Sequence, residues 1–189
     1  EAFFIYLKLA LISGTFIASP YIFYQIWMFV APGLYAHEKK YVVPFVFFST
    51  VLFTGGAIFG YFVIFPLAFE FLLHFAGAEV TAMPTMNSFF GFATRLLLAF
   101  GVVFEMPLAV FFLARVGVVT ADQMRGVRRY AIIAAFIVGA ILTPGPDPFS
   151  QCLMALPLIL LYEVSIWVAK VFGRKPYRTM EEESEALAG

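Results

Sequence analysis

The sequence predicts an all-α fold, a polytopic bundle of transmembrane helices, and three observations lead to this prediction. The first is composition: 62% of the 189 residues are hydrophobic and 13% are charged, and the mean hydropathy is +0.93. A soluble domain of this size cannot bury so much apolar side chain. The second is that the apolar residues fall into long runs. The third is that Lys and Arg gather in only some of the connections between these runs.

Five apolar runs approach or exceed the roughly 20 residues that a helix needs to cross a hydrocarbon core about 30 Å thick. We expect spans at about residues 3–30, 41–75, 89–116, 129–143 and 152–170. Together they form one transmembrane domain, residues 1–172. The polar, glutamate-rich segment 173–189 is expected to be a cytoplasmic tail.

The second run contains 35 residues, and as one straight helix it would be about 52 Å long, well beyond the hydrocarbon thickness. It must therefore tilt, kink or protrude. Glycine weakens a helix and proline removes a backbone donor. We expect a break near residue 66, with the part after it forming an amphipathic piece at the outer interface. The candidate break points are Gly55, Gly56, Gly60 and Pro66.

The last two runs are short. Their apolar cores, Tyr130 to Leu142 and Leu153 to Val168, contain 13 and 16 residues and reach only about 20 and 24 Å. Short spans thin the bilayer or draw water inward. We favour two genuine short spans, although a re-entrant pair that never crosses the membrane would leave the same charge pattern.

The basic residues predict the orientation of the chain. Ten of the twelve Lys and Arg residues lie in alternate connections or in the tail: Lys39, Lys40, Arg115, Arg125, Arg128, Arg129, Lys170, Arg174, Lys175 and Arg178. Because basic connections stay in the cytoplasm, the chain is expected to start outside and end inside. An outside start without a signal peptide is unusual. We therefore expect a further span before Glu1, which gives six spans with both ends cytoplasmic.

Charged residues inside the apolar runs are candidates for function or pairing, because each costs at least about 2.5–3.5 kcal/mol at the bilayer centre, and four of them are considered: Glu105, Glu163, Arg95 and Glu70. Glu105 lies near the middle of the third run, two residues before Pro107. It is a candidate functional group, or it forms a structural hydrogen bond with a neighbouring helix. Glu163 lies within about two turns of the cytoplasmic end, where it can also snorkel to water. Arg95 and Glu70 lie towards the outer face, where they can pair with each other or with lipid headgroups.

Two loop carboxylates are further candidates. Glu38 precedes Lys39 and Lys40 on the cytoplasmic side, and it is either an ordinary salt-bridged residue or part of a binding site. Asp147 lies in the proline-rich outer turn that contains Pro144 and Pro148, where it can cap the following helix.

Catalytic patterns are absent from the sequence. It contains no HExxH, GxSxG or Walker phosphate loop, and its single cysteine excludes a CxxC pair. We therefore expect no enzyme activity, no catalytic residue, no cofactor and no metal site. Nothing in the sequence suggests binding to nucleic acid.

Four segments in order carry a family resemblance: SPYIFYQIWMFVAPGLYAHEKK, FGVVFEMP, RRYAI and LTPGPDPFSQ. They resemble the TatC family, the core subunit of the Sec-independent twin-arginine protein translocase. The resemblance implies six spans in the inner, or cytoplasmic, membrane with both ends in the cytoplasm. It also implies a concave, cup-like helix array to which short last spans contribute. The family's N-terminal segment and first helix would precede Glu1.

The resemblance also implies a function. The chain would bind twin-arginine signal peptides at the cytoplasmic face and nucleate a translocon that exports folded proteins with the proton-motive force. Glu38 would contact the signal peptide, within a loop that includes Pro32, Gly33 and Tyr35. Glu105 would line the concave face, Glu163 would be a second intramembrane polar residue, and Asp147 with its prolines would form the outer turn. The implied partners are TatB-like and TatA-like single-span subunits, further copies of the chain, precursor proteins and membrane lipid.

Two other classes of function compete with this interpretation. A proton-coupled small-solute transporter would use Glu105 and Glu163 as proton carriers, although the sequence shows no paired, inverted halves. A purely structural membrane subunit is favoured only if Glu38 and Glu105 can be replaced freely.

Overall fold

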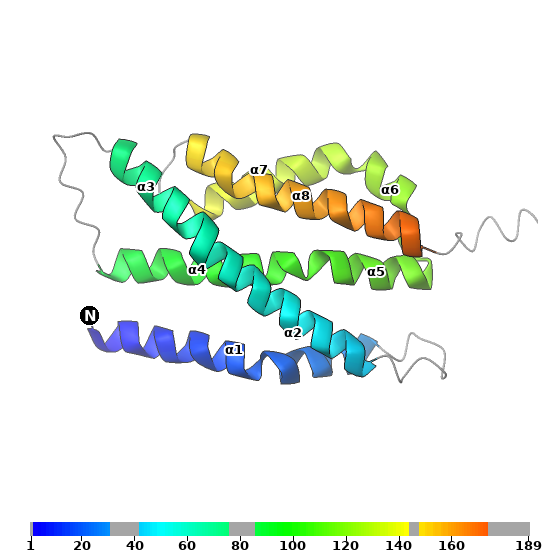
Figure 1. Ribbon diagram of the computed structural model, residues 1–189, viewed down its shortest axis with the longest axis horizontal. Helices are drawn as coiled ribbons and strands as arrows, with labels where there is room; N and C mark the ends of the chain where they lie inside the picture. Colours follow the sequence, from blue (N-terminus) through cyan, green and yellow to red (C-terminus); the bar gives the residue numbers. More distant parts are fainter. Residues whose placement is uncertain (1, 31–41, 76–85, 144–147, 174–189) are drawn as a thin grey trace, which may run out of the picture.

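The computed structural model describes residues 2–30, 42–75, 86–143 and 148–173, and all regular structure in these ranges is helical. The all-α prediction is therefore confirmed for the described residues. Figure 1 shows the elements in order: α1 (Ala2–Val30), α2 (Val42–Phe59), the π-helical η3 (Gly60–Ile64), α3 (Phe65–Phe75), α4 (Met86–Phe104), α5 (Met106–Val116), α6 (Ala121–Gly126), α7 (Arg128–Leu142) and α8 (Pro148–Phe172).

Four of the described helical segments are long and apolar enough to cross a membrane: Phe3–Phe29, Val43–Phe71, Met86–Val116 and Pro148–Phe172. They coincide with the first, second, third and fifth predicted spans. α7 covers the fourth predicted span with only 15 residues, a length of about 22 Å. α7 is therefore short, as expected.

α8 is longer than the apolar run from which it was predicted. The helix has 25 residues and is about 37 Å long, so only one of the two spans expected to be short is short. The difference arises because α8 begins at Pro148, a residue type that suits a first helical turn. It also continues through the polar Ser150, Gln151 and Lys170.

The second predicted span is one continuous helix that changes geometry before its proline. The Phe65 backbone N–H donates to the Gly60 carbonyl, five residues earlier, which makes η3 a π-helical turn. Pro66 follows directly, and α3 extends the helix without a separate interfacial piece. This long helix crosses the others diagonally in Figure 1, so its excess length is taken up by tilt and not by a break.

α4 and α5 form one rod that is interrupted at Glu105. The rod ends at Gly117, whose φ of +83° is a left-handed conformation that suits glycine. α6 then begins at a capping box, in which Gln123 N donates to Thr120 Oγ1 and Thr120 N donates to Gln123 Oε1. The basic connection between the third and fourth predicted spans is thus an ordered turn and helix.

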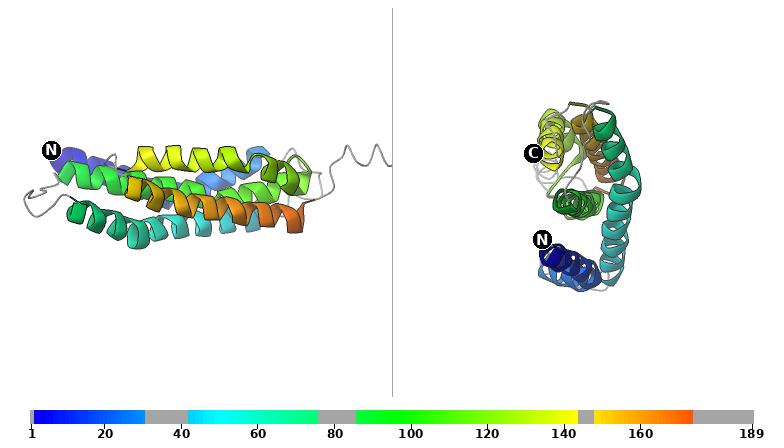
Figure 2. Two further views of the ribbon diagram at one scale, coloured as in Figure 1. Left: turned by 90° about the horizontal axis from the view of Figure 1, so that it is seen from above. Right: turned by 90° about the vertical axis from the view of Figure 1, so that its left-hand side faces the viewer.

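The helices lie in two layers when they are seen end-on (Figure 2, right). α2–α3 and α8 form one side, and α1, α4–α5 and α7 follow one another along the other side. α1 packs mainly on α2, and α7 mainly on α8, while α4 packs on α2 and α5 on α8. The main buried cluster lies where the layers meet: Ile64, Phe65, Ala68, Phe92, Leu96, Phe100, Ala135, Met154, Ala155 and Leu158.

The contact between α2 and α4 depends on glycine. A Cβ added to Gly56 would lie 2.5 Å from the Phe100 carbonyl oxygen, and one added to Gly101 would lie 2.7 Å from the Phe53 ring. Small residues let membrane helices approach closely, so that van der Waals contact replaces the hydrophobic driving force that lipid does not provide.

Candidate functional site

Glu105 lies at the junction between α4 and α5, inside a segment long enough to span a membrane. Pro107 follows two residues later and has no backbone N–H to continue the regular hydrogen bonding of the helix. The chain nevertheless continues as a helix, because Glu105 N donates to the Val102 carbonyl at 3.1 Å and Ala109 N donates to the Glu105 carbonyl at 2.9 Å. The junction therefore presents a carboxyl group from a rigid backbone.

The Glu105 carboxyl group faces α2, where it interacts with the Ser49 hydroxyl group and with the backbone of Phe53. Ser49 is fully buried, and its Oγ accepts a hydrogen bond of 2.9 Å from Nε1 of Trp27 on α1. Hydrogen bonds and polar contacts thus join three helical segments through Trp27, Ser49 and Glu105, and we call this arrangement the Trp27–Ser49–Glu105 network.

One oxygen of this carboxyl group remains without a partner. Glu105 Oε1 is buried and makes no hydrogen bond within the described part of the protein. A buried polar atom without a partner costs about 1–3 kcal/mol. The site is therefore suited to accept a donor from outside the chain, either a water molecule or a polar side chain of another helix.

Glu163 belongs to a different environment. Its Oε1 lies 2.5 Å from Nε of Arg128, the first residue of α7, in an ion pair whose geometry is not that of a hydrogen bond. The adjacent Tyr162 hydroxyl group donates to the Met124 carbonyl of α6 at 2.7 Å. Both contacts join α8 to the basic connection, so Glu163 is paired within the chain at that end of the bundle.

Arg95 and Glu70 lie on α4 and α3. Nε of Arg95 donates to the Gly91 carbonyl at 3.1 Å, one turn earlier on the same helix. The sequence left two possibilities for these residues, pairing with each other or with lipid headgroups, and among the described residues no ion pair joins Arg95 to Glu70. In the same ranges, no group of three or more His, Cys, Asp and Glu side chains is placed to hold a metal ion.

Comparison with known proteins decides the family. A family model described as "Sec-independent protein translocase protein (TatC)" matches residues 1–157. The chain belongs to the TatC family. A TatC protein of Desulforapulum autotrophicum is 48% identical over 185 residues, which cover 98% of this chain and 68% of that relative. A TatC protein of Halothiobacillus neapolitanus is 51% identical over 184 residues, which cover 97% of this chain and 50% of that relative.

A solved structure agrees with the family assignment. A crystal structure described as "Twin Arginine Translocase Receptor- TatC" superposes with a TM-score of 0.82 at 43% sequence identity, covering 92% of this chain and 76% of that one. Membership of the TatC family confirms the prediction of a helical membrane bundle. It also confirms the prediction that the chain is a component of protein transport rather than an enzyme. The chain spans about half the length of the Halothiobacillus relative and about two thirds of the Desulforapulum relative.

Most of the loop residues predicted for a TatC site fall outside the described residues. These are Pro32, Gly33, Tyr35 and Glu38 of the cytoplasmic loop, and Pro144 and Asp147 of the outer turn. Pro148 is described, as the first residue of α8. Close to it, Nε2 of Gln151 donates to the Phe136 carbonyl of α7 at 3.0 Å, which fixes the two helices beside the turn.

Sequence reasoning missed the residues that surround Glu105. Ser49 is one hydroxyl in a long apolar run, and Trp27 precedes the basic loop, where an aromatic residue at the membrane interface is ordinary. Neither residue signals a partner in the sequence, because their contact depends on how α1 and α2 pack. The sequence offered one signal, a small polar residue inside an apolar run, and it applies to Ser49 but not to Trp27.

Proposed function

We propose that this chain forms the receptor core of a twin-arginine translocase in the cytoplasmic membrane. In this proposal it binds twin-arginine signal peptides at its cytoplasmic face, nucleates the translocon and exports folded proteins with the proton-motive force. Membership of the TatC family supports the proposal. The observation that links it to a particular residue is the buried Oε1 of Glu105, which has no hydrogen-bond partner among the described residues.

Recognition of the signal peptide is assigned to the loop that contains Pro32, Gly33, Tyr35 and Glu38. A guanidinium group is held best by a carboxylate, because two parallel charge-assisted hydrogen bonds match the geometry of both groups. Glu38 supplies this carboxylate next to Lys39 and Lys40, on the side that the basic residues predict to be cytoplasmic. The same rule predicts a cytoplasmic C-terminal tail.

Glu105 is assigned to the partner helices. A TatA-like or TatB-like single-span subunit would donate a hydrogen bond to Oε1 from a polar side chain within the membrane. Such contacts are worth only about 0.6–2 kcal/mol each in lipid, so a stable receptor needs several of them, from further copies of the chain as well as from single-span subunits.

The first experiment tests recognition of the signal peptide. A photoreactive peptide with two consecutive arginines is crosslinked to membranes that contain the protein or its Glu38→Gln variant. The matched control is Asp122→Asn, because Asp122 is another carboxylate of a basic connection and is exposed. We expect Glu38→Gln to lower crosslinking about tenfold or more, since a charge-assisted pair is lost, and Asp122→Asn to leave it unchanged. Equal crosslinking in all three proteins would remove Glu38 from the site.

The second experiment tests the intramembrane role of Glu105. Export of a folded reporter is measured in cells that carry Glu105→Gln or Glu105→Ala, with Glu163→Gln as a control carboxylate that is paired with Arg128. We expect Glu105→Ala to stop export while Glu105→Gln, which can still accept a hydrogen bond at its amide oxygen, retains part of it. Normal export by Glu105→Ala, with the protein present at wild-type amount, would return Glu105 to a structural role.

A further inference from the structure

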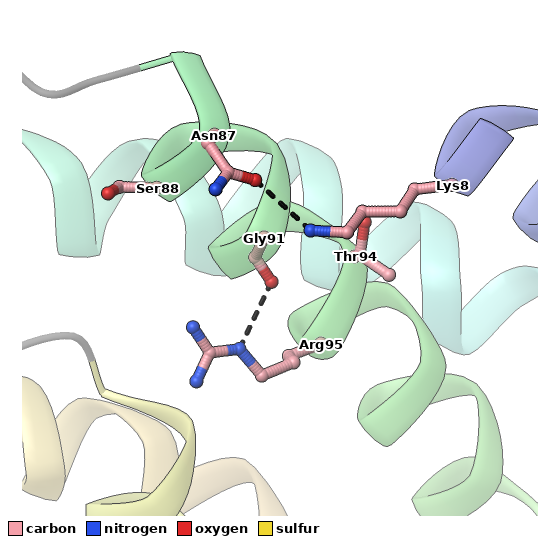
Figure 3. A pocket seen from close by; sticks show the side chains of 6 residues that line it. All are labelled: Lys8, Asn87, Ser88, Gly91, Thr94 and Arg95. Carbon is pink, nitrogen blue, oxygen red and sulfur yellow. Dashed lines mark hydrogen bonds between the residues drawn. The ribbon is translucent and has the colours of Figure 1, made fainter. Parts of the chain in front are cut away.

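A pocket of about 530 Å³ with a mainly polar lining lies between α1 and α4 (Figure 3). It is lined by Lys8, Asn87, Ser88, Gly91, Thr94 and Arg95. It lies near the starts of α1 and α4, the end of the bundle that the basic residues predict to face outside. At a rise of about 1.5 Å per residue, Lys8 is about 9 Å and Arg95 about 13 Å along its helix from the first residue. The two membrane-length segments have 27 and 31 residues and exceed a hydrocarbon core of about 30 Å by about 10 and 16 Å in total. When this excess is shared between the two ends, both cations lie within about 6 Å of the headgroup region, which their long side chains can reach.

The two cations retain hydrogen-bonding capacity. Nζ of Lys8 donates to Oδ1 of Asn87 at 3.1 Å, and Nε of Arg95 donates to the Gly91 carbonyl at 3.1 Å. Figure 3 shows Lys8 reaching across from α1, while the two terminal nitrogens of Arg95 point away from the helix. A lysine has three donors and an arginine five. The ion pairs within the described ranges involve neither residue, so the pocket is electropositive and rich in donors, as an oxyanion site requires.

A second, apolar pocket of about 250 Å³ is formed by α1 and α4 together with α2, at residues farther along α1 and α4 from their first residues. It is lined by Phe16, Thr54, Ala57, Ile58, Tyr61, Phe62 and Leu97. Leu97 follows Thr94, which lines the first pocket, by three residues on the same side of α4, and Phe16 follows Lys8 by eight residues, or about 12 Å, on α1. Along both helices, the apolar pocket therefore follows the polar one towards the middle of the spans. A soluble anion would use only the first of these pockets, whereas an amphiphile would use both.

We propose that this groove binds an anionic phospholipid from the outer leaflet, with its phosphate group between Lys8 and Arg95 and one acyl chain in the apolar pocket. The phosphate oxygens accept hydrogen bonds from the ammonium and guanidinium groups, and the amide group of Asn87 is available to a glycerol headgroup. The acyl chain covers the exposed side of Ile58, which is 53% exposed. The bound lipid would contact both α1 and α4, which make few direct contacts with each other, and would thereby join the two helices.

The test uses the protein in lipid nanodiscs with phosphatidylglycerol that carries a photoreactive group at its head. Crosslinks are mapped by mass spectrometry to the peptides of α1 and α4. We expect Lys8→Gln and Arg95→Gln each to lower crosslinking there about tenfold at subsaturating lipid, because each removes a charge-assisted contact. Lys8→Arg and Arg95→Lys should remain within about threefold of wild type, since the charge remains.

Three controls make the result decisive. Arg129→Gln changes an exposed cation at the opposite end of the bundle, so it should leave the α1–α4 crosslink unchanged. Ile58→Trp fills the apolar pocket and should weaken the crosslink with both cations intact. Inorganic phosphate in large excess should not displace the lipid.

Two results would overturn the proposal. Displacement by inorganic phosphate together with no effect of Ile58→Trp would show a site for a free oxyanion. Equal crosslinking in wild type and in the Lys8→Gln, Arg95→Gln double variant would show only non-specific lipid contact.

Discussion

Replacement of Gly56 by alanine should loosen the packing of α2 against α4. The added Cβ would lie 2.5 Å from the Phe100 carbonyl oxygen and 2.8 Å from the side chain of Phe104. An ordinary contact needs about 3.5 Å, so the helices must separate locally by about 1 Å. The obstacle includes backbone, which cannot rotate away as the end of a flexible side chain can. Overpacking of this kind costs about 1–3 kcal/mol.

Gly55 provides the matched control, because an added Cβ at Gly55 meets nothing within 4 Å. The two glycines are adjacent in α2, so both alanine variants gain the same intrinsic helix propensity, about 0.5–1 kcal/mol. The difference between them isolates the steric term. Gly55→Ala should be as stable as wild type or slightly more stable, and Gly56→Ala should be less stable than Gly55→Ala by about 1–3 kcal/mol.

The measurement is thermal unfolding of the purified protein in a mild detergent. Its readout is the fraction of protein that remains monodisperse in size-exclusion chromatography after heating. The three proteins are compared at the same detergent concentration, because unfolding of a membrane protein can be irreversible and then reports a rate. If Gly56→Ala and Gly55→Ala lose monodisperse protein at the same temperature, the close approach of α2 and α4 does not stabilise the fold and the reasoning is refuted.

Further variants test the polar contacts in the same assay. Ser49→Ala should cost about 1–3 kcal/mol, because the buried indole N–H of Trp27 loses its acceptor. Trp27→Phe removes the donor, so the double variant should cost less than the sum of the two single variants. Additive losses would exclude an energetic coupling between Ser49 and Trp27. Arg128→Gln should cost no more than about 1 kcal/mol, since its ion pair with Glu163 is 55% and 36% exposed; a loss of several kcal/mol would show that the pair is effectively buried. Thr120→Ala should cost about 0.5–2 kcal/mol through loss of the cap, and an unchanged transition would show that the basic connection is uncoupled from the bundle.

The sequence predicted the elements of the fold better than their limits. Hydropathy located the helices, because lipid requires long apolar runs whatever the tertiary structure. It failed at the start of α8, where Ser150 and Gln151 are polar but face other helices: Ser150 is buried and Gln151 donates to the Phe136 carbonyl of α7. The tilt that accommodates α2–α3 was predicted only as one of three possibilities, since tilt is set by packing against neighbouring helices.

The candidate site was predicted as single residues and not as an arrangement. Glu105 was identifiable because a charge in an apolar run is costly wherever the run packs. Its contacts with Ser49 and Phe53 required the register between two helices that are separated by more than fifty residues in the chain. That register follows from close contact at glycines, which a hydropathy profile records only as neutral positions.

One face of the helix formed by α2 and the start of η3 combines these two features. Ser49, Phe53, Gly56 and Gly60 follow at intervals of four, three and four residues, so they lie on one side of the helix. Ser49 and Phe53 interact with Glu105, while Gly56 and Gly60 contact α4 near Phe100. Because the glycines fix the distance between the helices, they also fix the position of Ser49 relative to the carboxyl group. The tight apolar contact and the intramembrane acid are therefore parts of one interface between α2 and the α4–α5 rod. A larger residue at Gly56 that separates these helices also changes the groups from which Glu105 can accept a hydrogen bond.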